Sequence, residues 1–452
     1  MTVFDIREFG AVGDGVTNDA ASIQAAIDAA GSTGGGTVLV PAGATFLSGS
    51  LLLRNYVELH IQRGAVLQAS ADWDQITQRL SVSALSAGVI GEEPRESGAF
   101  LWAEDATGIA VTGAGVIDGN GRGYVLEDLG EIYLMPVERP FPLFFLNCSD
   151  VTIRESTWRD GALWTIRLTG CEHVVIDGIR IDGDLKLPNV DGIDLDRCRN
   201  VRVSNCDIRC GDDAISLKTC EEFPDSGLCE NIVVTNCVLQ STSSALVVGV
   251  DATSPIRNVV FDNCVVIASH RGLSVNLGQE GDFENILFSN IVVETRLFDD
   301  RWWGRGEPIY VSAYPWHEKV GRMRNVRFVN ILARSENGAF ISALHPDAID
   351  GLLLENVQIE LDAWSGLLGG WYDRRPFSQG IELYEHPTSG FHIDGATNVV
   401  LRDCEVTWGS AQPHFAHAVE AHRTEGLRIT GLRGASARPG ELVSISSEQP
   451  WT

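Results

Sequence analysis

The sequence predicts an all-β fold, a right-handed parallel β-helix (a solenoid) with a short capping helix near its N-terminus. Three observations lead to this prediction: a recurring strand motif, asparagines at fixed places in that motif, and one amphipathic helical segment near the start. A solenoid packs each repeat only on its neighbours, so 452 residues need not divide into ordinary domains. We expect a single domain over residues 1–452, with the cap and first strands in 1–50 and the central and C-terminal coils in 140–435.

The repeat is a strand-like segment of seven residues. Its six copies are 200–206, 231–237, 258–264, 285–291, 325–331 and 398–404. Apolar residues alternate within each copy, which is the period of a strand with one buried face. The first five copies follow at intervals of 31, 27, 27 and 40 residues, counted along Asn205, Asn236, Asn263, Asn290 and Asn330. One strand motif per short interval is typical of a solenoid, whereas a β-propeller repeat is longer and more regular.

The five asparagines just counted predict a ladder. Asparagine tolerates the left-handed backbone that tight turns need. Stacked turns would also let each side-chain amide donate a hydrogen bond to the next. We assign these residues a structural role and no catalytic one.

One clear helix is predicted over residues 20–30, closed by Gly31, with Asn18 or Asp19 as its N-cap. This helix would cover the apolar end of the solenoid. The middle of the chain lacks the eight amphipathic helices that a TIM barrel requires.

The charge and the cysteines restrict the partners. A net charge of −27 makes nucleic acid and anionic membranes poor partners, because both need a basic face. No apolar run reaches the length of a membrane span, and residues 1–8 do not resemble a secretory signal, so we expect a cytoplasmic protein.

Most of the ten cysteines lie in strand-like runs and are expected to be buried thiols, while Cys220 and Cys229 flank a loop and could form a disulfide only in an exported protein. No pair of Cys-x-x-Cys motifs is present, and we expect neither a metal nor a cofactor. The oligomeric state is not indicated.

Three aspartates lie on two neighbouring turns: Asp191 in segment 189–194, and Asp212 and Asp213 in segment 210–218. Asp191 and Asp212 are 21 residues apart, about one short turn, and stacked strands are about 4.8 Å apart. We therefore expect the carboxylates to cluster. Adjacent strand residues point to opposite faces, so Asp212 and Asp213 can share a groove only at a bend, which Gly211 would permit.

Clustered carboxylates repel, and one of them is favoured in its protonated form. A carboxylic acid beside a carboxylate can hydrolyse a glycosidic bond: one group protonates the leaving oxygen and another activates water. The alternatives at this point are a simple Gly-Asp-Asp turn or a calcium site.

Three motifs carry a resemblance to a known family: residues 9–19 (FGAVGDGVTND), 189–194 (NVDGID) and 211–213 (GDD). Together they resemble glycoside hydrolase family 28, the polygalacturonase family among the pectin-lyase-like β-helices, over about residues 4–430. The resemblance implies that Asp212 is the general acid, that Asp191 and Asp213 activate water, and that the anomeric centre is inverted. The roles of Asp212 and Asp213 could be exchanged.

The chain departs from the family at two motifs. Ser244 stands where the family's Gly-His-Gly has its histidine, and Ser274 and Asn276 stand where Arg-x-Lys is expected. Those basic residues resemble a clamp for the galacturonate carboxylate, and a buried carboxylate without partners costs several kcal/mol. We expect the cleaved residue to be neutral, or a uronate held by Arg271 or Lys218.

The insert before residue 325 contains Trp302, Trp303, Glu307 and Tyr310, and we interpret it as a wall of the binding groove where indole rings stack on sugars. Long loops that close a groove favour exo action on short chains; Trp316, His317, Trp371 and Tyr372 lie in such loops. The complete set of expected substrate-binding residues is Asn189, Lys218, Ser244, Arg271, Asn276, Trp303, Glu307 and Tyr310.

The sequence thus predicts an inverting, exo-acting glycoside hydrolase for a plant-derived, pectin-related oligosaccharide. One alternative is a polysaccharide lyase on the same fold, which needs a strong base and often calcium. A second is a non-catalytic carbohydrate-binding solenoid. The sequence does not identify the sugar or the linkage.

Overall fold

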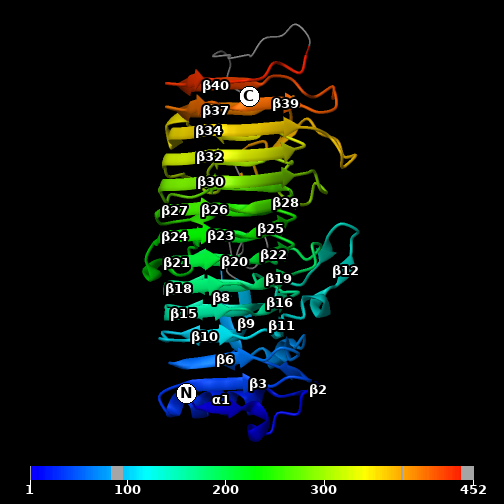
Figure 1. The fold of residues 1–452 in the computed structure, drawn as a ribbon, viewed down its shortest axis with the longest axis vertical. Coiled ribbons are helices and arrows are strands. Elements are labelled where there is room, and N and C mark those ends of the chain that lie inside the picture. Colours follow the sequence, from blue (N-terminus) through cyan, green and yellow to red (C-terminus); the bar gives the residue numbers. More distant parts are fainter. Residues whose placement is uncertain (1, 83–94, 378–379, 439–452) are drawn as a thin grey trace. The chain divides into compact units, whose positions relative to one another are not determined.

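The computed structural model describes residues 2–82, 95–377 and 380–438 (Figure 1). The chain divides into two compact units, Met1–Ile215 with Cys220–Ile232, and Ser216–Thr219 with Val233–Thr452. Most strands of each unit pair in parallel with the strands one coil further along the chain. This confirms the predicted all-β class and the right-handed parallel β-helix. That the whole chain forms one domain stays a prediction.

Helix α1 (Ala20–Ser32) lies at the N-terminal end of the first unit. Its buried side chains, Ile23, Ala26, Ile27 and Ala30, face the first strands, β1 (Val3–Asp5), β3 (Gly36–Val40), β5 (Leu51–Leu52) and β6 (Val57–Ile61). The capping helix is therefore confirmed, but two details differ. Gly31 lies inside the helix and does not end it. Asp19 stands at the N-cap without capping, because its carboxylate accepts the N–H groups of Val12 and Gly13 instead.

The coils of the first unit contain three strands each. One coil consists of β17 (Ile166–Thr169), β18 (Glu172–Asp177) and β19 (Arg180–Asp182), and the next consists of β20 (Ile193–Asp196), β21 (Arg199–Ser204) and β22 (Asp207–Cys210). The register is 27 residues, since Ile166 pairs with Ile193 and Val174 with Val201. This register brings the end of one coil directly beside the same point of the next.

The second unit has the same kind of coil, with strands of three to thirteen residues. They are β25 (Val238–Ser241), β26 (Ser244–Ala252), β27 (Ile256–Asp262), β28 (Val265–Ser269), β29 (Arg271–Leu277), β30 (Phe283–Thr295), β31 (Ile309–Ala313), β32 (Met323–Ser335), β33 (Ala339–Ala343), β34 (Ile349–Leu361), β37 (Phe391–Thr397), β38 (Val400–Arg402), β39 (Glu405–Trp408), β40 (Val419–Glu425) and β41 (Arg428–Thr430). Three of them, β30, β32 and β34, run through the asparagine turn without a break. The insert before β37 forms an antiparallel hairpin of β35 (Trp371–Asp373) and β36 (Leu383–Glu385).

The asparagine ladder is present in the second unit. Asn263 donates to Asn236 at 2.7 Å, and Asn356, Asn330 and Asn290 form a run of two such bonds. The ladder is interrupted once, because Asn290 donates to Asp262 rather than to Asn263. A second ladder, which the sequence analysis did not identify, joins the first asparagine of each motif: Asn325 donates to Asn285, and Asn285 to Asn258.

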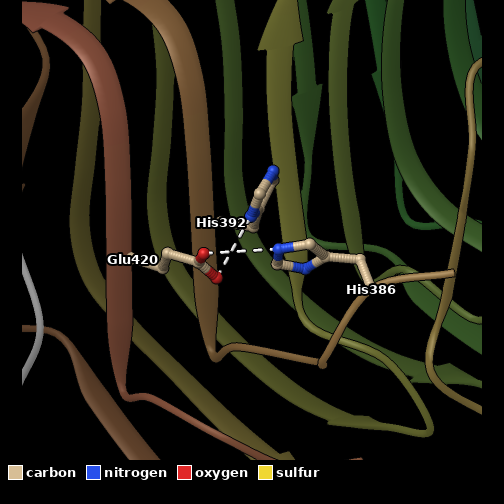
Figure 2. A group of neighbouring side chains, drawn as sticks. All are labelled: His386, His392 and Glu420. Atoms are coloured by element: carbon tan, nitrogen blue, oxygen red, sulfur yellow. Dashed lines mark hydrogen bonds and ion pairs between the residues drawn. The ribbon is translucent and has the colours of Figure 1, made fainter. Parts of the chain in front are cut away.

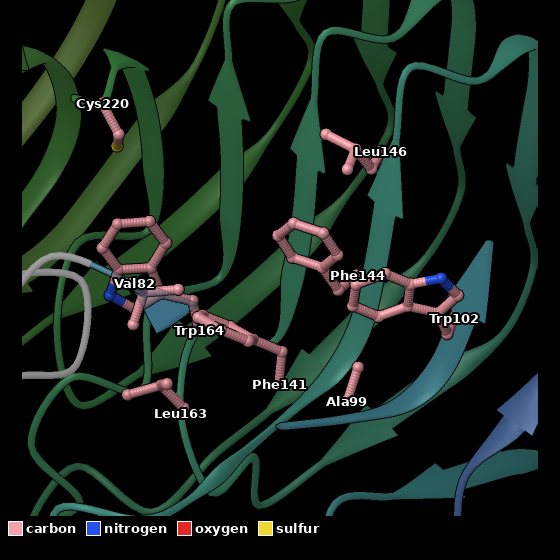
Figure 3. Packing of buried hydrophobic residues seen from close by; sticks show 9 residues of the cluster. All are labelled: Val82, Ala99, Trp102, Phe141, Phe144, Leu146, Leu163, Trp164 and Cys220. Atoms are coloured by element: carbon pink, nitrogen blue, oxygen red, sulfur yellow. The ribbon is translucent and has the colours of Figure 1, made fainter. Parts of the chain in front are cut away.

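An aromatic cluster lies in the first unit (Figure 3). Its buried members are Val82, Ala99, Trp102, Phe141, Phe144, Leu146, Leu163, Trp164 and Cys220. Trp102 of β9 (Arg95–Glu104) pairs in register with Phe144 of β14 (Pro140–Leu146), and Phe144 with Arg167 of β17. The fully buried Arg167 lies over the rings of Phe144 and Trp164, 5.3 and 4.8 Å from their centres, and forms ion pairs with Asp196 and Glu222 at 3.0 and 2.7 Å.

The ten cysteines are all buried free thiols, Cys220 and Cys229 included. Burial raises the pKa of the Cys171 thiol well above its ordinary value, so this thiol stays neutral. Among the described residues, no helix has the length and apolar character to cross a bilayer.

Candidate active site

The three aspartates meet in the first unit, at the ends of two neighbouring coils. Asp191 lies two residues before β20, and Asp212 and Asp213 occupy the bend that joins β22 to β23 (Ile215–Thr219). One carboxylate oxygen from each of the three lies within 4.8 Å of the others. Asp191 is buried, while Asp212 and Asp213 are partly exposed. The expected cluster and the expected bend are therefore both present.

Backbone hydrogen bonds fix this geometry. The N–H of Gly192 donates to the carbonyl of Asp213 at 2.9 Å, and the N–H of Thr165 donates to the carbonyl of Asp191 at 2.9 Å. The N–H of Asn189, a residue with a left-handed φ of 58°, donates to Oδ2 of Asp212 at 3.0 Å. The loop that carries Asp191 thus orients the carboxylate of Asp212.

Gly211 is needed here for a reason other than its φ. A Cβ at this position would lie 2.1 Å from the carbonyl oxygen of Leu187, a distance that no side chain tolerates. The loop before Asp191 can therefore pack against the bend only because residue 211 has no side chain. Cys210 just before it donates to the carbonyl of Asp212 at 3.1 Å, and burial, with the charge of Asp191 second, raises the pKa of its thiol.

Arg139 is a component of the site that the sequence analysis missed. Its guanidinium is buried and donates to the carbonyls of Ala162 and Pro188, at 3.0 and 2.9 Å, and to Oδ1 of Asn189 at 3.1 Å. Burial lowers the pKa of Arg139 to about 10, although the charges of Asp212 and Asp191 oppose this shift. The site therefore contains a fixed positive charge close to its negative ones. No motif surrounds Arg139, so its position could not be recognised from the sequence.

Three of the predicted substrate-binding residues come together in the second unit, but they are buried. Arg271 is 2% exposed, stacks 3.8 Å above the Tyr310 ring and faces Glu307 at 3.7 Å and Asp373 at 3.4 Å. Burial raises the pKa of Glu307, and Tyr310 donates its hydroxyl to the carbonyl of Asp373. These groups join the insert before β31 to the β35–β36 hairpin, and in this arrangement Arg271 has no surface to offer a sugar.

The other candidates in the second unit are also enclosed to different degrees. Lys218 is 4% exposed and its Nζ lies 3.4 Å from Oδ2 of Asp251. Ser244 is buried, and Asn276 is 7% exposed and accepts a hydrogen bond from Ser312. Trp302 is buried, whereas Trp303 is partly exposed. Burial of Trp302 leaves its indole ring no surface on which a sugar could stack. For Asn189 and the other candidates, a role in substrate binding stays a prediction.

Three carboxylates clustered at adjacent coil ends of a β-helix supply the kind of acid and base groups that hydrolysis of a glycosidic bond requires. Comparisons with known proteins identify the family. The profile of "Glycosyl hydrolases family 28" matches residues 42–296, more than half of the chain, and a rhamnogalacturonase A/epimerase, pectate lyase-like profile matches residues 3–76. The chain belongs to glycosyl hydrolases family 28.

Individual proteins are similar to this chain in sequence or in fold. The chain is 31% identical over 216 residues to a probable polygalacturonase from Vitis vinifera, a match that covers 47% of this chain and 43% of that protein. The chain thus spans less than half the length of this curated relative. The family 28 exopolygalacturonase of Yersinia enterocolitica has a similar structure, with a TM-score of 0.69 and 19% identity over 94% of this chain and 78% of that one. An exopolygalacturonase from Thermotoga maritima has a TM-score of 0.55 and 18% identity, and the match covers 95% of this chain and 92% of that one.

Proposed function

We propose that this protein is a glycoside hydrolase that acts on pectin-related oligosaccharides through Asp191, Asp212 and Asp213. The observation that carries the proposal is the clustering of three carboxylates within 4.8 Å at two adjacent coil ends. Membership of family 28 supports it, because the two aspartate motifs lie inside the matched region 42–296.

In the proposed mechanism, Asp212 protonates the leaving glycosidic oxygen while Asp191 and Asp213 hold and activate a water molecule. This division follows the family pattern, and three carboxylates supply one acid and two acceptors for the water. The hydrogen bond from the N–H of Asn189 orients the Asp212 carboxyl group, and the buried Arg139 offsets part of the negative charge of the group.

We propose that the reaction inverts the anomeric centre. Carboxyl groups of inverting enzymes are generally about 6.5–9.5 Å apart and those of retaining enzymes about 5–5.5 Å apart. The 4.8 Å limit given above applies to the closest oxygens, so it is shorter than the separation between carboxyl groups. Proton NMR of the first product formed distinguishes the outcomes: the opposite anomer supports inversion, and the same anomer would assign one aspartate as a nucleophile.

We further propose that the enzyme acts at chain ends and that the sugar at the cleavage point is neutral. Two proteins of similar structure, from Yersinia enterocolitica and Thermotoga maritima, are exopolygalacturonases, and this motivates the first part. The second part rests on Arg271 and Lys218, the two cations expected to replace the family's clamp, which are both buried and paired with carboxylates. A uronate would find neither of them available without a rearrangement of the loops.

The test is product release from a panel of pectic and neutral plant oligosaccharides, with wild type compared with Asp212→Asn by ion-exchange chromatography. We expect a saturated monosaccharide from wild type and at least a hundredfold slower release from the variant, because general acid catalysis contributes about 10²–10⁴-fold. Asp207→Asn is the matched control: it makes the same change at an exposed residue of β22 and should leave release unchanged.

Each other outcome points to a specific alternative. An unsaturated product would identify a lyase. Binding of a sugar that persists in Asp212→Asn, with no release by wild type from any substrate, would identify a non-catalytic binding protein.

A further inference from the structure

A second cluster of potential ligands lies in the second unit, separate from the aspartates. His392 of β37 and Glu420 of β40 occupy paired positions on neighbouring strands. His386 follows β36 and reaches them from the hairpin insert (Figure 2). One nitrogen or oxygen atom from each residue lies within 4.8 Å of the others, and all three residues are buried.

The hydrogen bonds of His386 determine which of its nitrogens faces the carboxylate. Nδ1 lies 2.7 Å from the carbonyl oxygen of Pro387, and because a carbonyl can only accept, Nδ1 carries the proton. In the neutral ring, Nε2 then presents its lone pair to Oε1 of Glu420, 3.4 Å away. A metal-binding histidine is commonly oriented in this way, with one nitrogen donating to a backbone carbonyl and the other on the metal.

The distances around Glu420 fall into two groups. Nε2 of His422 lies 2.8 Å from Oε1 and the Ser389 hydroxyl lies 2.8 Å from Oε2, both normal hydrogen bonds. By contrast, Nε2 of His386 and Nδ1 of His392 each lie 3.4 Å from an oxygen of the carboxylate. A charged imidazolium–carboxylate bond would be about 2.7–2.9 Å. Donors on a tetrahedral zinc ion with bonds of about 2.0–2.1 Å are about 3.3–3.4 Å apart. The two histidine–carboxylate distances have this length, one to Oε1 and the other, a long hydrogen bond, to Oε2 of Glu420.

We propose that His386, His392 and Glu420 bind a divalent transition metal ion, zinc, with His422 as a positioning residue that donates to the Glu420 carboxylate. Two imidazoles and a carboxylate are a common ligand set for zinc, with the fourth position left to water. The ion would join the hairpin insert to β37 and β40. It would thereby hold in place the hairpin whose Tyr372 packs on His392, with ring centres 4.7 Å apart, and on Phe340. This proposal does not depend on the proposed hydrolase activity.

The test uses the full chain, freed of metal with a chelator, mixed with zinc chloride and desalted before its zinc is measured by atomic emission. We expect about one zinc ion per chain for wild type. Glu420→Gln and His386→Gln should retain none. His345→Gln, a change at an exposed histidine, and Asp212→Asn, a change in the other carboxylate cluster, should retain it. Circular dichroism checks that the variants are folded. We expect His386→Gln to fold, because His386 lies outside the strands of the coils.

Two further readouts distinguish a metal site from a hydrogen-bonded network. Zinc should raise the thermal unfolding temperature of wild type and of Asp212→Asn but not of Glu420→Gln, since binding stabilises only the form with an intact site. His422→Ala should keep the stoichiometry and weaken zinc affinity about 10–100-fold. The proposal is overturned if wild type retains no more zinc than Glu420→Gln, or if Asp212→Asn alone removes it.

Discussion

At the scale of single residues, the candidate active site is a balance of charge. Three carboxylates lie within 4.8 Å, and the nearby guanidinium of Arg139 is buried and held by three oxygen acceptors. Because Asn189 accepts from Arg139 and donates its N–H to Asp212, the cation also acts on the acid through a shared neighbour. Arg139 should therefore influence both the position and the ionisation of the carboxylates.

Arg139→Met removes this charge while keeping much of the side-chain volume. We expect kcat/KM to fall about 10–100-fold, since a misplaced catalytic group has an effect of this size. The acidic limb of the pH–rate profile should move to higher pH, because a lost positive charge makes neighbouring carboxylates easier to protonate. Full pH profiles of the variant and wild type measure both effects.

Arg209→Met is the control for this prediction. Arg209 lies on β22 near the same bend, but its side chain is 45% exposed and 3.8 Å from Asp182. Its replacement should leave the profile in place. A fall in rate for Arg139→Met without any shift of the acidic limb would mean that Arg139 only supports the fold, and Arg139→Lys, which restores the charge, should recover part of the shift.

The catalytic candidates could be predicted from sequence because their spacing along the chain is about one short turn of the solenoid. At this point the turn is shorter than the 27-residue register of the strands before it, since the N–H of Gly192 donates to the carbonyl of Asp213, 21 residues further on. Asp191 and Asp212 are 21 residues apart, and neighbouring coils bring such positions together. Arg139 could not be found in this way, since it reaches the site through a long side chain from before β14. The surroundings of Arg271 could not be predicted either, because Asp373, which is distant in sequence, pairs with it. Its role as a substrate cation stays a prediction.

At the scale of structural elements, the asparagine ladders determine where each coil turns. The ladder residues Asn236, Asn263, Asn290, Asn330 and Asn356 all have a φ between 51° and 57°. The motif thus supplies both the turn geometry and a bond along the stack. The repeat could be recognised from sequence for this reason, whereas the β35–β36 hairpin could not, because inserts carry no repeat.

Asn330 permits a separate test of the two contributions. It donates to Asn290 and accepts from Asn356. Asn330→Gly should lose about 1 kcal/mol of unfolding free energy, because exposed hydrogen bonds contribute at the low end of about 0.5–1.5 kcal/mol each. Asn330→Ala should lose about 1–2 kcal/mol more, the cost of a left-handed backbone for a residue with a Cβ. Urea unfolding measures both, and equal losses would show that the backbone conformation is not the dominant contribution.

At the scale of the whole molecule, the dominant property is a net charge of −27. Such a charge repels polyanions unless a local basic site attracts them. The two cations expected to form that site, Arg271 and Lys218, are buried and paired. The burial of these cations and the net negative charge both disfavour a charged sugar at the cleavage point.

Salt dependence tests whether the substrate at the cleavage point is charged. Raising the ionic strength from about 0.01 M to about 0.15 M shortens the screening length from about 30 Å to about 8 Å. If recognition is by neutral groups, KM for a uronate-rich oligosaccharide should fall as salt screens the repulsion, while KM for a neutral oligosaccharide of the same length should stay constant. A KM for the anionic substrate that rises with salt would instead reveal attraction to a cationic subsite. Arg271→Met and Lys218→Met would then show which cation is responsible, because only the loss of the residue in contact with the substrate would remove the salt dependence.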